Sequence, residues 1–459
     1  MVPVRKLASL SLSALLASGL IAHAAVADVI KLKLWTLNDR NAPMRTVNIE
    51  EAAGVLNQQF AAAGVDRKIV IDTHASAVQG WDDLALDTLK AFGVNQGPDI
   101  VLLPHEWIGE FARNGYAMPM DGQIKANPWV YADMLPVLWE AMKYQGKVYG
   151  VPQDAEIRMF FYNKDMLRKI GKDDAFIDSL PARVDSGEFT MDDLTALAKE
   201  VVDRGAAPIG MLHRPNVGID YLMVFAACGA KFMDEKTGKL LFAKKEVETA
   251  LSWYARNVAA GVTPTDNTAM SWDTIQTAFK QEKAFLFHQG IWAMAWQVND
   301  NFGPAWPADK AGYTHKIGWI AAPAAVKGGK PANLSHPIAY VVSNKSQYKD
   351  LAAQLVAIAS LPYYNNRHAV SSYHTAISHA QTAMPQYTDN WALSDAGKMM
   401  KNITFVPNHA RFGDYNRVLF KGLQAVETKR MTPAQAVDFI ADELETQLGK
   451  DVEIVDSLH

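Results

Sequence analysis

The sequence predicts an α/β fold in which a mostly parallel sheet is covered by helices on both faces. Between residues 30 and 103, segments with the pattern of strands alternate with segments of helical periodicity, which is typical of βαβ units. The segment 99–103 is almost wholly apolar, as expected of a strand buried on both sides. With 459 residues, 49% of them hydrophobic and 20% charged, the chain can bury a large core.

The first predicted strand covers 30–34, where apolar and polar side chains alternate up to Trp35. A helical pattern follows over 47–60 and stops at Gly64, a residue type common after helix ends. The next predicted elements, in order, are a strand over 68–73, a helix over 81–92 that ends before Gly97 and Pro98, and a strand over 99–103.

Three loops follow the carboxyl ends of these strands, at 36–40, 74–81 and 104–107. In open parallel sheets, ligands bind beyond the carboxyl ends of the strands. We therefore expect side chains at these positions to contact a ligand, and the candidates are Trp35, Trp81 and His105.

The second half of the chain is more helical. Thr190 with Asp193 starts one predicted helix, and Thr432 with Pro433 starts another. No repeat, low-complexity tract or long flexible linker interrupts the sequence. Two lobes would therefore be joined by several crossings of the chain rather than by one tether.

The N-terminus has the pattern of a secretory signal peptide. Arg5 and Lys6 precede an apolar run over 7–22, and small residues over 25–27 precede Asp28, which predicts cleavage at that point. Removal of the two basic residues makes the charge two units more negative than the −4 of the full sequence. No second apolar stretch is long enough to span a bilayer. We expect a soluble protein in an exported compartment, most simply a bacterial periplasm.

Composition and motifs exclude several function classes. The 45 basic and 49 acidic residues leave no basic excess for nucleic-acid binding. A single cysteine, Cys228, excludes a disulfide framework and a cysteine-ligated metal site, and its small apolar neighbours predict an inert, buried thiol. The phosphate-binding loop, the dinucleotide fingerprint and the Gly-x-Ser-x-Gly elbow are all missing from the sequence. We predict no cofactor and no catalytic residue.

Two histidine patterns resemble parts of a metal site, but each lacks a ligand that such a site needs. His105 and Glu106 begin like a zinc-protease helix, but Gly109 stands where the second histidine ligand would be. Three further histidines lie close together in sequence without a visible carboxylate partner, so we predict no metal there either. They are His368, His374 and His379.

Several carboxylates fall at predicted strand ends and loops, positions that suit either catalysis or sugar binding. They are Asp39, Glu106, Asp154 and Glu156. Two carboxylates across a glycosidic bond would make a secreted glycoside hydrolase. Carboxylates also accept hydrogen bonds from sugar hydroxyls while an indole covers the apolar face of the ring, and the chain has 12 tryptophans. Spacing alone does not separate these uses.

Short motifs occur in a fixed order along the chain. They are Gly146-Lys-Val-Tyr-Gly-Val-Pro152, Phe161-Tyr-Asn-Lys-Asp-Met-Leu-Arg-Lys-Ile-Gly171, Gly229-Ala-Lys-Phe232, Thr237-Gly-Lys239, Phe279-Lys-Gln-Glu-Lys-Ala284, Gln289-Gly-Ile-Trp292, Ile317-Gly-Trp-Ile-Ala-Ala-Pro323, Ala339-Tyr-Val-Val-Ser-Asn-Lys345 and Met431-Thr-Pro-Ala-Gln-Ala436. Each is weak alone. Together they resemble the extracellular solute-binding proteins of ABC sugar importers, of the maltose-binding-protein-like kind, and this resemblance covers essentially all of the chain after the signal peptide.

The resemblance implies two α/β lobes of the type II periplasmic binding protein, joined by a multi-crossing hinge with one ligand in the cleft. The first lobe would comprise 28–154 and about 338–385, and the second 155–337 and about 386–459. It also implies a monomer that closes around its ligand, with the membrane permease of an ABC transporter as its partner. Such a protein is not an enzyme.

By the same resemblance, five positions match ligand contacts of this family. Asp39 and Arg40 follow the first strand, and Glu106 ends the third. Glu156 lies at the first hinge crossing, and Trp292 matches the tryptophan on which a sugar ring stacks. These five residues are predicted to bind the ligand.

Other positions depart from the family pattern. Leu103 replaces a stacking tryptophan, and Trp107 stands where a ligand-contacting arginine would be. The aromatic segment of the second lobe has no close match, and Tyr221 is the candidate there. Four further candidates lie near the hinge crossings, of which the first two would otherwise serve the hinge itself: Gln153, Asp154, Tyr373 and His374.

Three arginines bear on the charge of the ligand. Arg158, Arg214 and Arg411 are expected to be surface salt-bridge partners, but if two of them lined the cleft, a phosphate or carboxylate on the ligand would follow. The expected function is capture of a carbohydrate or related polyol for an ABC permease. A phosphorylated sugar, a glycerophosphodiester or an opine is the alternative ligand, and a two-carboxylate glycoside hydrolase is the alternative activity.

Overall fold

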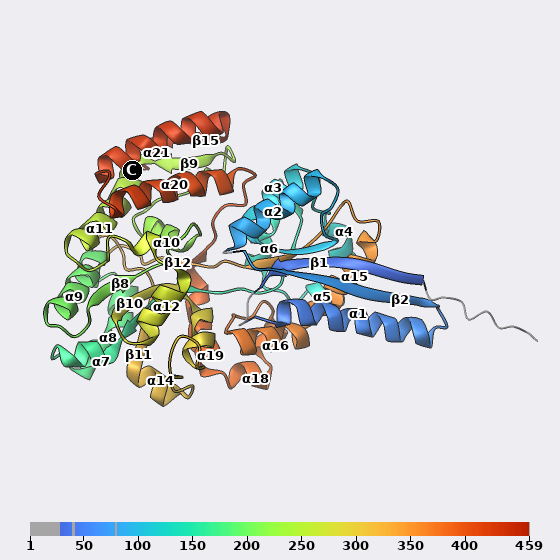
Figure 1. Ribbon diagram of the computed structural model, residues 1–459, viewed down its shortest axis with the longest axis horizontal. Helices are drawn as coiled ribbons and strands as arrows, with labels where there is room; N and C mark the ends of the chain where they lie inside the picture. Colours follow the sequence, from blue (N-terminus) through green and yellow to red (C-terminus); the bar gives the residue numbers. More distant parts are fainter. Residues whose placement is uncertain (1–27, 39–41, 79, 459) are drawn as a thin grey trace, which may run out of the picture.

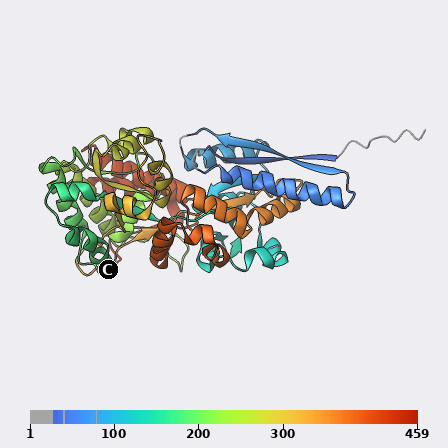
Figure 2. The same cartoon turned by 90° about the horizontal axis from the view of Figure 1, so that it is seen from below.

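The computed structural model describes residues 28–38, 42–78 and 80–458, with only the backbone at 401 and 402. Two α/β bodies lie side by side along the long axis of the molecule (Figures 1 and 2). We call the body that holds the first strand of the chain the first lobe, and the other the second lobe. The predicted two-lobed α/β fold is confirmed. The predicted signal peptide, Asp39 and Arg40 lie outside the described residues.

The first lobe is built on a five-stranded sheet with the strand order β2-β1-β3-β13-β6. Strands β1, β2 and β3 are parallel, whereas β13 runs antiparallel to both β3 and β6. The strands are β1 (Asp28–Leu37), β2 (Arg67–Ser76), β3 (Ile100–Pro104), β6 (Val151–Pro152) and β13 (Ile338–Val342). The predicted parallel strands are therefore present, and a distant part of the chain completes their sheet.

Burial in this sheet follows the sequence pattern. Every residue of β3 is buried, and β1 alternates between buried and exposed side chains from Ile30 to Leu34. Helix α1 lies on one face of the sheet, and α2 and α3 lie on the other (Figure 1). These helices, with α15 beside α1, are α1 (Met44–Ala62), α2 (Trp81–Gly93), α3 (Ile108–Arg113) and α15 (Lys349–Ala359).

The second lobe is built on a four-stranded sheet with the strand order β11-β7-β10-β8. Strand β10 runs parallel to β8 and antiparallel to β7. All residues of β7 and β10 are buried, so helices cover the middle of this sheet on both faces. The strands are β7 (Arg158–Asn163), β8 (Ile209–Leu212), β10 (Ala284–Gly290) and β11 (Ile317–Ile320).

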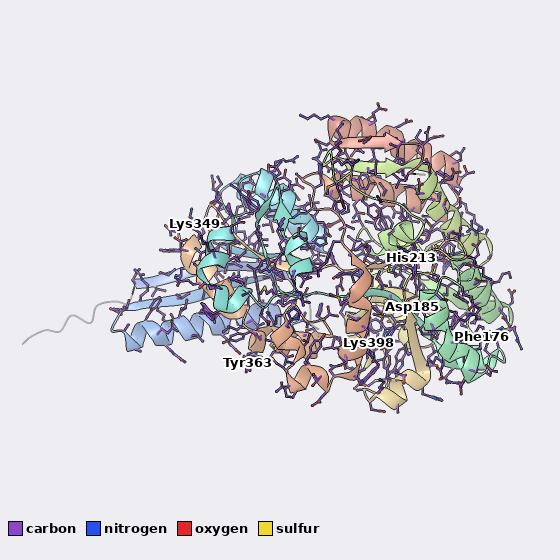
Figure 3. All side chains as sticks on the ribbon, turned by 180° about the vertical axis from the view of Figure 1, so that it is seen from behind. Phe176, Asp185, His213, Lys349, Tyr363 and Lys398 are labelled. Carbon is purple, nitrogen blue, oxygen red and sulfur yellow. The ribbon has the colours of Figure 1, made fainter. Side chains whose placement is uncertain are left out.

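The helices of the second lobe come from the middle and the end of the chain. Both predicted capping boxes are confirmed, with Thr190 bonded to Asp193 and Thr432 bonded to Gln435. His213 lies inside this lobe (Figure 3). None of the described helices is both long enough and apolar enough to cross a membrane. The main helices are α8 (Asp174–Asp185), α9 (Met191–Asp203), α10 (Asp220–Ala227), α11 (Lys244–Ala259), α12 (Trp272–Lys280), α19 (Trp391–Gly397), α20 (Phe412–Glu427) and α21 (Pro433–Leu448).

Three chain segments meet at a hinge between the lobes, and we name them by their ranges: 153–157, 335–337 and 373–378. The backbone N of Thr375 donates to the carbonyl oxygen of Ala155 at 2.8 Å, which joins the first segment to the third. The third segment follows α16 (Pro362–Ser372), which packs on α1 of the first lobe. These segments pass where the sequence predicts the crossings, while the lobe boundaries stay predictions.

Cys228 is half-buried in the second lobe, with its Sγ 3.8 Å from Met191 Sδ. Burial raises the pKa of the thiol to about 12. A thiol that stays protonated is a poor nucleophile, so the prediction of an inert side chain agrees with its environment.

Candidate functional site

A cavity of about 150 Å³ lies between the two lobes, beside the hinge. It opens beyond the carboxyl end of β1, where ligands bind in sheets of this kind. Both lobes and the hinge contribute to its wall. The first lobe supplies Leu37, Arg45, Gly80, Trp81 and Ile338, the second lobe Arg158, Arg214, Trp272, Gln276 and Trp292, and the hinge Glu156, His336 and His374.

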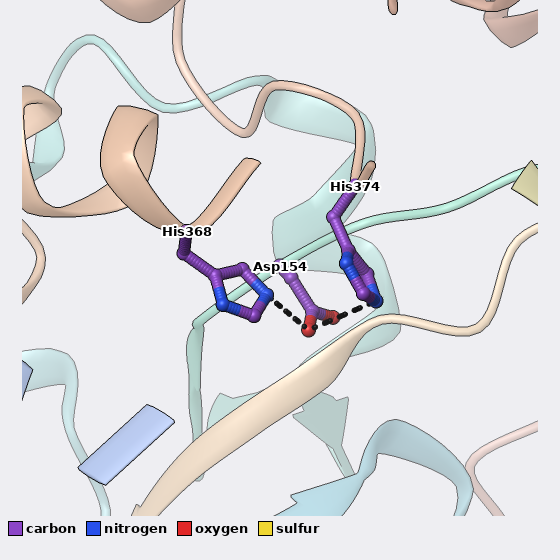
Figure 4. A group of neighbouring side chains, drawn as sticks. All are labelled: Asp154, His368 and His374. Atoms are coloured by element: carbon purple, nitrogen blue, oxygen red, sulfur yellow. Dashed lines mark hydrogen bonds and ion pairs between the residues drawn. The ribbon is translucent and has the colours of Figure 1, made fainter. Parts of the chain in front are cut away.

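Asp154 lies behind the cavity wall and connects the hinge to the first lobe. Its Oδ1 accepts a hydrogen bond from the backbone N of Ile338 at 3.0 Å. Its Oδ2 accepts one from Arg45 Nη2 at 2.8 Å and lies 3.1 Å from His368 Nε2 (Figure 4). Burial alone would raise the pKa of Asp154, but His374, Arg45 and His368 hold it well below the ordinary value. The ionised carboxylate therefore holds three distant segments together.

Asp154, His368 and His374 also have the composition of a metal site. One ligand atom from each lies within 4.8 Å of the others (Figure 4). However, Arg45 Nη2 lies 2.8 Å from Asp154 Oδ2 and 3.3 Å from His374 Nε2, so a permanent cation already contacts both. A second cation would be repelled strongly at this range. The residues fit a guanidinium and not a metal ion, and His379 is exposed and lies outside the cluster.

A second group of buried charges forms the wall on the side of the second lobe. Arg158 lies 2.5 Å from Glu156 Oε1 and 2.5 Å from Asp220 Oδ1, and Arg214 lies 3.3 Å from Asp220 Oδ2. Burial raises the pKa of Glu156 in spite of Arg158. Burial alone would also raise the pKa of Asp220, but Arg158 and Arg214 hold it well below the ordinary value.

The arginines therefore differ from the sequence prediction. Arg158 is only 2% exposed and Arg214 is half-buried, and both line the cavity, so their assignment to surface salt bridges is wrong. The strand β7 begins at Arg158 and directs it inward, toward Asp220 at the start of α10. Arg411 does pair near the surface, with Asp414 Oδ2 at 2.6 Å.

Each tryptophan of the cavity has a guanidinium over its ring. Arg45 lies 5.1 Å from the ring centroid of Trp81, and Arg158 lies 5.7 Å from that of Trp292. The third pair, Arg214 and Trp272, is 5.1 Å apart. Trp272 and Trp292 also meet edge to face, with centroids 6.3 Å apart. Such contacts stabilise the pairs and fix the guanidinium planes in the wall.

Gly290, at the end of β10, allows two wall residues to approach the backbone. A Cβ atom on Gly290 would lie 2.3 Å from Trp292 Nε1 and 2.6 Å from Glu156 Oε2. Both distances are shorter than any van der Waals contact, so a larger residue would displace one side chain or both. The glycine is required by close approach, because its φ of −82° is open to other residues.

Glu106 and His105 lie behind the cavity, directly after β3. Glu106 Oε1 is 2.9 Å from His336 Nε2, and His336 lines the cavity. Burial alone would raise the pKa of Glu106, but His336 and His105 lower it to about 2. Burial lowers the pKa of His105 to about 4. Neither residue lines the cavity, and Glu106 contacts its wall through His336, so their part in binding stays a prediction.

The other predicted residues are placed around the cavity or farther from it. Trp35 packs on a histidine of β2, with ring centroids 5.0 Å apart. Tyr221 is 3% exposed, and its hydroxyl donates at 2.9 Å to a backbone carbonyl oxygen of α20. Gln153 accepts a hydrogen bond from Arg45 Nε at 3.4 Å, and Tyr373 ends α16 with a φ of 53°.

The structure brings four of the predicted residues together at the cavity, and their part in binding stays a prediction. They are Trp81, Glu156, Trp292 and His374. The sequence prediction missed Trp272, although Trp272 and Trp81 each begin a helix at the cavity and this shared position could have identified it. It also missed Arg45 and His336, which reach the cavity only because distant segments meet at the hinge.

Residues 46–365 match the family model of the bacterial extracellular solute-binding proteins. The chain belongs to this family. It is 25% identical over 241 residues to a maltotriose-binding protein of Pyrococcus abyssi, a match that covers 52% of this chain and 46% of that protein. The chain thus spans about half the length of the curated relatives that it matches.

Solved structures of solute-binding proteins share the fold. T. maritima MalE3 with bound maltose superimposes with a TM-score of 0.72 at 18% identity, over 92% of this chain and 100% of that one. A solute-binding protein of Thermotoga lettingae, bound with α-D-tagatose, has a TM-score of 0.69 at 19% identity, over 91% and 100%. The prediction of a maltose-binding-protein-like solute-binding protein is confirmed, and its relatives are binding proteins rather than enzymes.

Proposed function

We propose that this solute-binding protein captures a carbohydrate or related polyol between its lobes and delivers it to the permease of an ABC transporter. The observation that carries the proposal is the cavity wall, where three tryptophans stand among arginine, glutamate and histidine side chains. Indole rings cover the apolar face of a sugar, and charged side chains bond its hydroxyls. The maltose and tagatose in the related structures support this ligand class.

The mechanism follows from the origin of the wall residues. Arg45 and Trp81 come from the first lobe, and Arg158 and Trp292 from the second, so closure of the cleft brings both sets onto one ligand. Ligand shifts the protein toward the closed form only because it binds that form better. Glu156 lies in a hinge segment and lines the cavity, so it connects ligand binding to the hinge. The closed form is what the permease would recognise.

The composition of the wall disfavours glycoside hydrolysis. Glu156 is the one carboxylate among the described residues that line the cavity. Asp154 and Asp220 are 1% and 0% exposed and are bound by arginines behind it. A two-carboxylate mechanism needs both groups to face the scissile bond. The wall therefore suits binding without covalent chemistry.

The remaining parts of the proposal concern place and organisation. The predicted signal peptide would direct the protein to the periplasm, where it would act as a monomer. The lobes would comprise 28–154 with about 338–385, and 155–337 with about 386–459. The strands β1, β2, β3, β6 and β13 form one sheet and β7, β8, β10 and β11 form the other, which supports this assignment of the chain to two lobes.

A thermal-shift screen of residues 28–459 against monosaccharides, oligosaccharides and polyols tests the proposal. Ligand at about 1,000 times its Kd stabilises a protein by about 4 kcal/mol, which raises the Tm by several degrees. Trp292→Ala should abolish the shift, whereas Trp129→Ala, at a side chain 64% exposed, should keep it. Absence of any shift, in protein shown by native mass spectrometry to be free of ligand, would refute the proposal.

A further inference from the structure

The cavity wall presents more guanidinium groups than carboxylates. Three arginines line it: Arg45, Arg158 and Arg214. Glu156 is the one acidic side chain among the described lining residues. The aspartates that pair with the arginines lie behind the wall, so a ligand meets the cationic side of each pair.

The two arginines of the second lobe pair with two carboxylates, of which Glu156 lines the cavity and Asp220 does not. Arg158 and Arg214 share one aspartate, with Asp220 Oδ1 2.5 Å from Arg158 and Asp220 Oδ2 3.3 Å from Arg214. Arg158 also contacts Glu156 Oε1 at 2.5 Å, and its Nη2 lies 3.2 Å from His336 Nδ1. Among the described lining residues, a ligand on this side therefore meets two guanidinium groups and the one carboxylate of Glu156.

Both of these arginines keep a nitrogen that the protein does not use. Arg158 is 2% exposed, and its Nε has no hydrogen-bond partner among the described residues. Arg214 Nε donates to Asn216 and to the carbonyl oxygen of Val217 in its own loop, and Nη1 donates to Asp220. Its Nη2 has no hydrogen-bond partner in the described part of the chain. Gly80 leaves space beside this Nη2, since a Cβ there would still lie 3.7 Å away. Arg214 Nη2 is therefore the donor that a ligand can reach, while Arg158, whose Nε is fully buried, contributes its positive charge to the wall.

The volume of the cavity in this structure favours a ligand of about one sugar ring. Its volume of about 150 Å³ equals that of about five water molecules at ~30 Å³ each. Drug-sized ligands occupy pockets of ~300–1,000 Å³. Trp272 and Trp292 fix the two guanidinium planes, so the wall is ordered before a ligand arrives.

We propose that the preferred ligand is a monosaccharide-sized sugar acid whose carboxylate is bound by Arg158 and Arg214. This inference rests on the proposed carbohydrate binding and narrows it. A planar carboxylate matches the fork of a guanidinium, and its single negative charge suits a wall that presents three guanidinium groups and one carboxylate among its described residues. A phosphate would carry a charge of about −1.5 to −2 into the same small volume.

Calorimetric titration of residues 28–459 tests the charge of the ligand. The panel pairs hexuronates, aldonates and pentonates with their neutral parent sugars and polyols, and adds the corresponding sugar phosphates and maltotriose. The expected result is a sugar acid bound at least about 10-fold more tightly than its neutral parent, with an affinity that falls as salt is added. Tighter binding of the neutral parent, of the phosphate or of maltotriose would overturn the inference.

A matched set of variants tests the arginine. Arg214→Gln should weaken binding of the acid by about 10- to 100-fold and of the neutral parent by less than about threefold. Arg214→Lys should restore part of the difference, since it keeps the charge and loses the fork. Arg256→Gln is the control, because Arg256 pairs with Asp192 at 2.7 Å on the surface. Equal losses for acid and neutral sugar would show a merely structural role and overturn the inference.

Failure of this inference can be told apart from failure of the proposed function. If a neutral sugar binds and no acid does, the sugar-binding function stands and the inference is wrong. If no compound in the panel binds to ligand-free protein, the function itself is wrong, and the inference with it. Unfolding curves of each variant show that the compared proteins are folded.

Discussion

Two buried arginine–aspartate groups border the cavity, and they differ in how fully their hydrogen bonds are used. At the hinge, Asp154 binds Arg45 and the backbone of Ile338, so both carboxylate oxygens hold chain segments together. In the second lobe, Asp220 binds two arginines, and Arg158 Nε has no hydrogen-bond partner among the described residues. The comparison teaches that a buried ion pair does not by itself mark a binding site.

The largest effect should come from the hinge group. Asp154→Ala removes the buried carboxylate that accepts hydrogen bonds from Arg45 and from the backbone of Ile338, and is expected to lower the free energy of unfolding by about 3–5 kcal/mol. Urea denaturation measures this change. Asp192→Ala, at an exposed ion pair, is the control and should cost less than about 1 kcal/mol. A similar small loss for both variants would contradict the role given to Asp154.

Acid should destabilise the protein through three buried histidines whose pKa is lowered in the folded state. Burial lowers the pKa of His105 to about 4 and of His288 to about 3, and that of His374 well below its ordinary value. The unfolded chain protonates these side chains below about pH 6.5 while the folded protein does not, so stability falls as the pH drops through that value. Each histidine lowers the free energy of unfolding by about 1.4 kcal/mol per pH unit below that value, and the three together by about 4 kcal/mol per pH unit.

Denaturation curves between pH 7 and pH 5 measure this slope. His288→Asn should reduce it by about one third, and the exposed His379→Asn should leave it unchanged. Burial alone would lower the pKa of His213, but the neighbouring Glu427 has the larger effect and holds this pKa above its ordinary value. Its contribution is present in full below about pH 6.5 and is lost only at higher pH, so it does not offset the fall. A flat profile would show that these histidines are not buried as neutral groups.

A moderate effect is expected where the backbone approaches the wall. Gly290→Ala forces Trp292 or Glu156 out of position, and overpacking of this kind costs about 1–3 kcal/mol. Sugar affinity, measured by calorimetry, should fall by about 10-fold or more. Gly122→Ala, where the new Cβ meets nothing within 4 Å, serves as the control. Unchanged affinity in Gly290→Ala would exclude Trp292 and Glu156 from the site.

The smallest effect should come from the arginine that does lie near the surface. Arg411→Gln breaks a pair with Asp414 that water already screens, and we expect a loss below about 1 kcal/mol. Sugar affinity should stay unchanged, in contrast with Arg214→Gln. If Arg411→Gln weakened binding as much, proximity of Arg214 to the cavity would not explain its effect.

The parallel strands of the first lobe, two helix starts and the family could be predicted from the sequence. Alternating and wholly apolar runs placed β1 and β3, and the capping residues at Thr190 and Thr432 placed α9 and α21. Ordered short motifs placed the family. These features depend on residues that are near one another in the chain, so their signal survives without a structure.

The site required long-range contacts that no local pattern encodes. Arg158 was expected at the surface because nothing near it in sequence shows that Asp220 lies 2.5 Å away. Likewise, His368 and His374 gave no visible carboxylate partner, because Asp154 lies 214 residues before His368 in the sequence. Tyr221 was expected at the ligand because of its aromatic ring; the ring packs in the core of the second lobe, and its part in binding stays a prediction.

Small-angle scattering from residues 28–459, with and without a saturating sugar from the screen, tests the central claim that ligand is held between the lobes. We predict a smaller radius of gyration with the sugar, and no change in Trp292→Ala at the same concentration. An identical radius with and without a sugar that calorimetry shows to be bound would place the ligand outside the cleft and contradict the account.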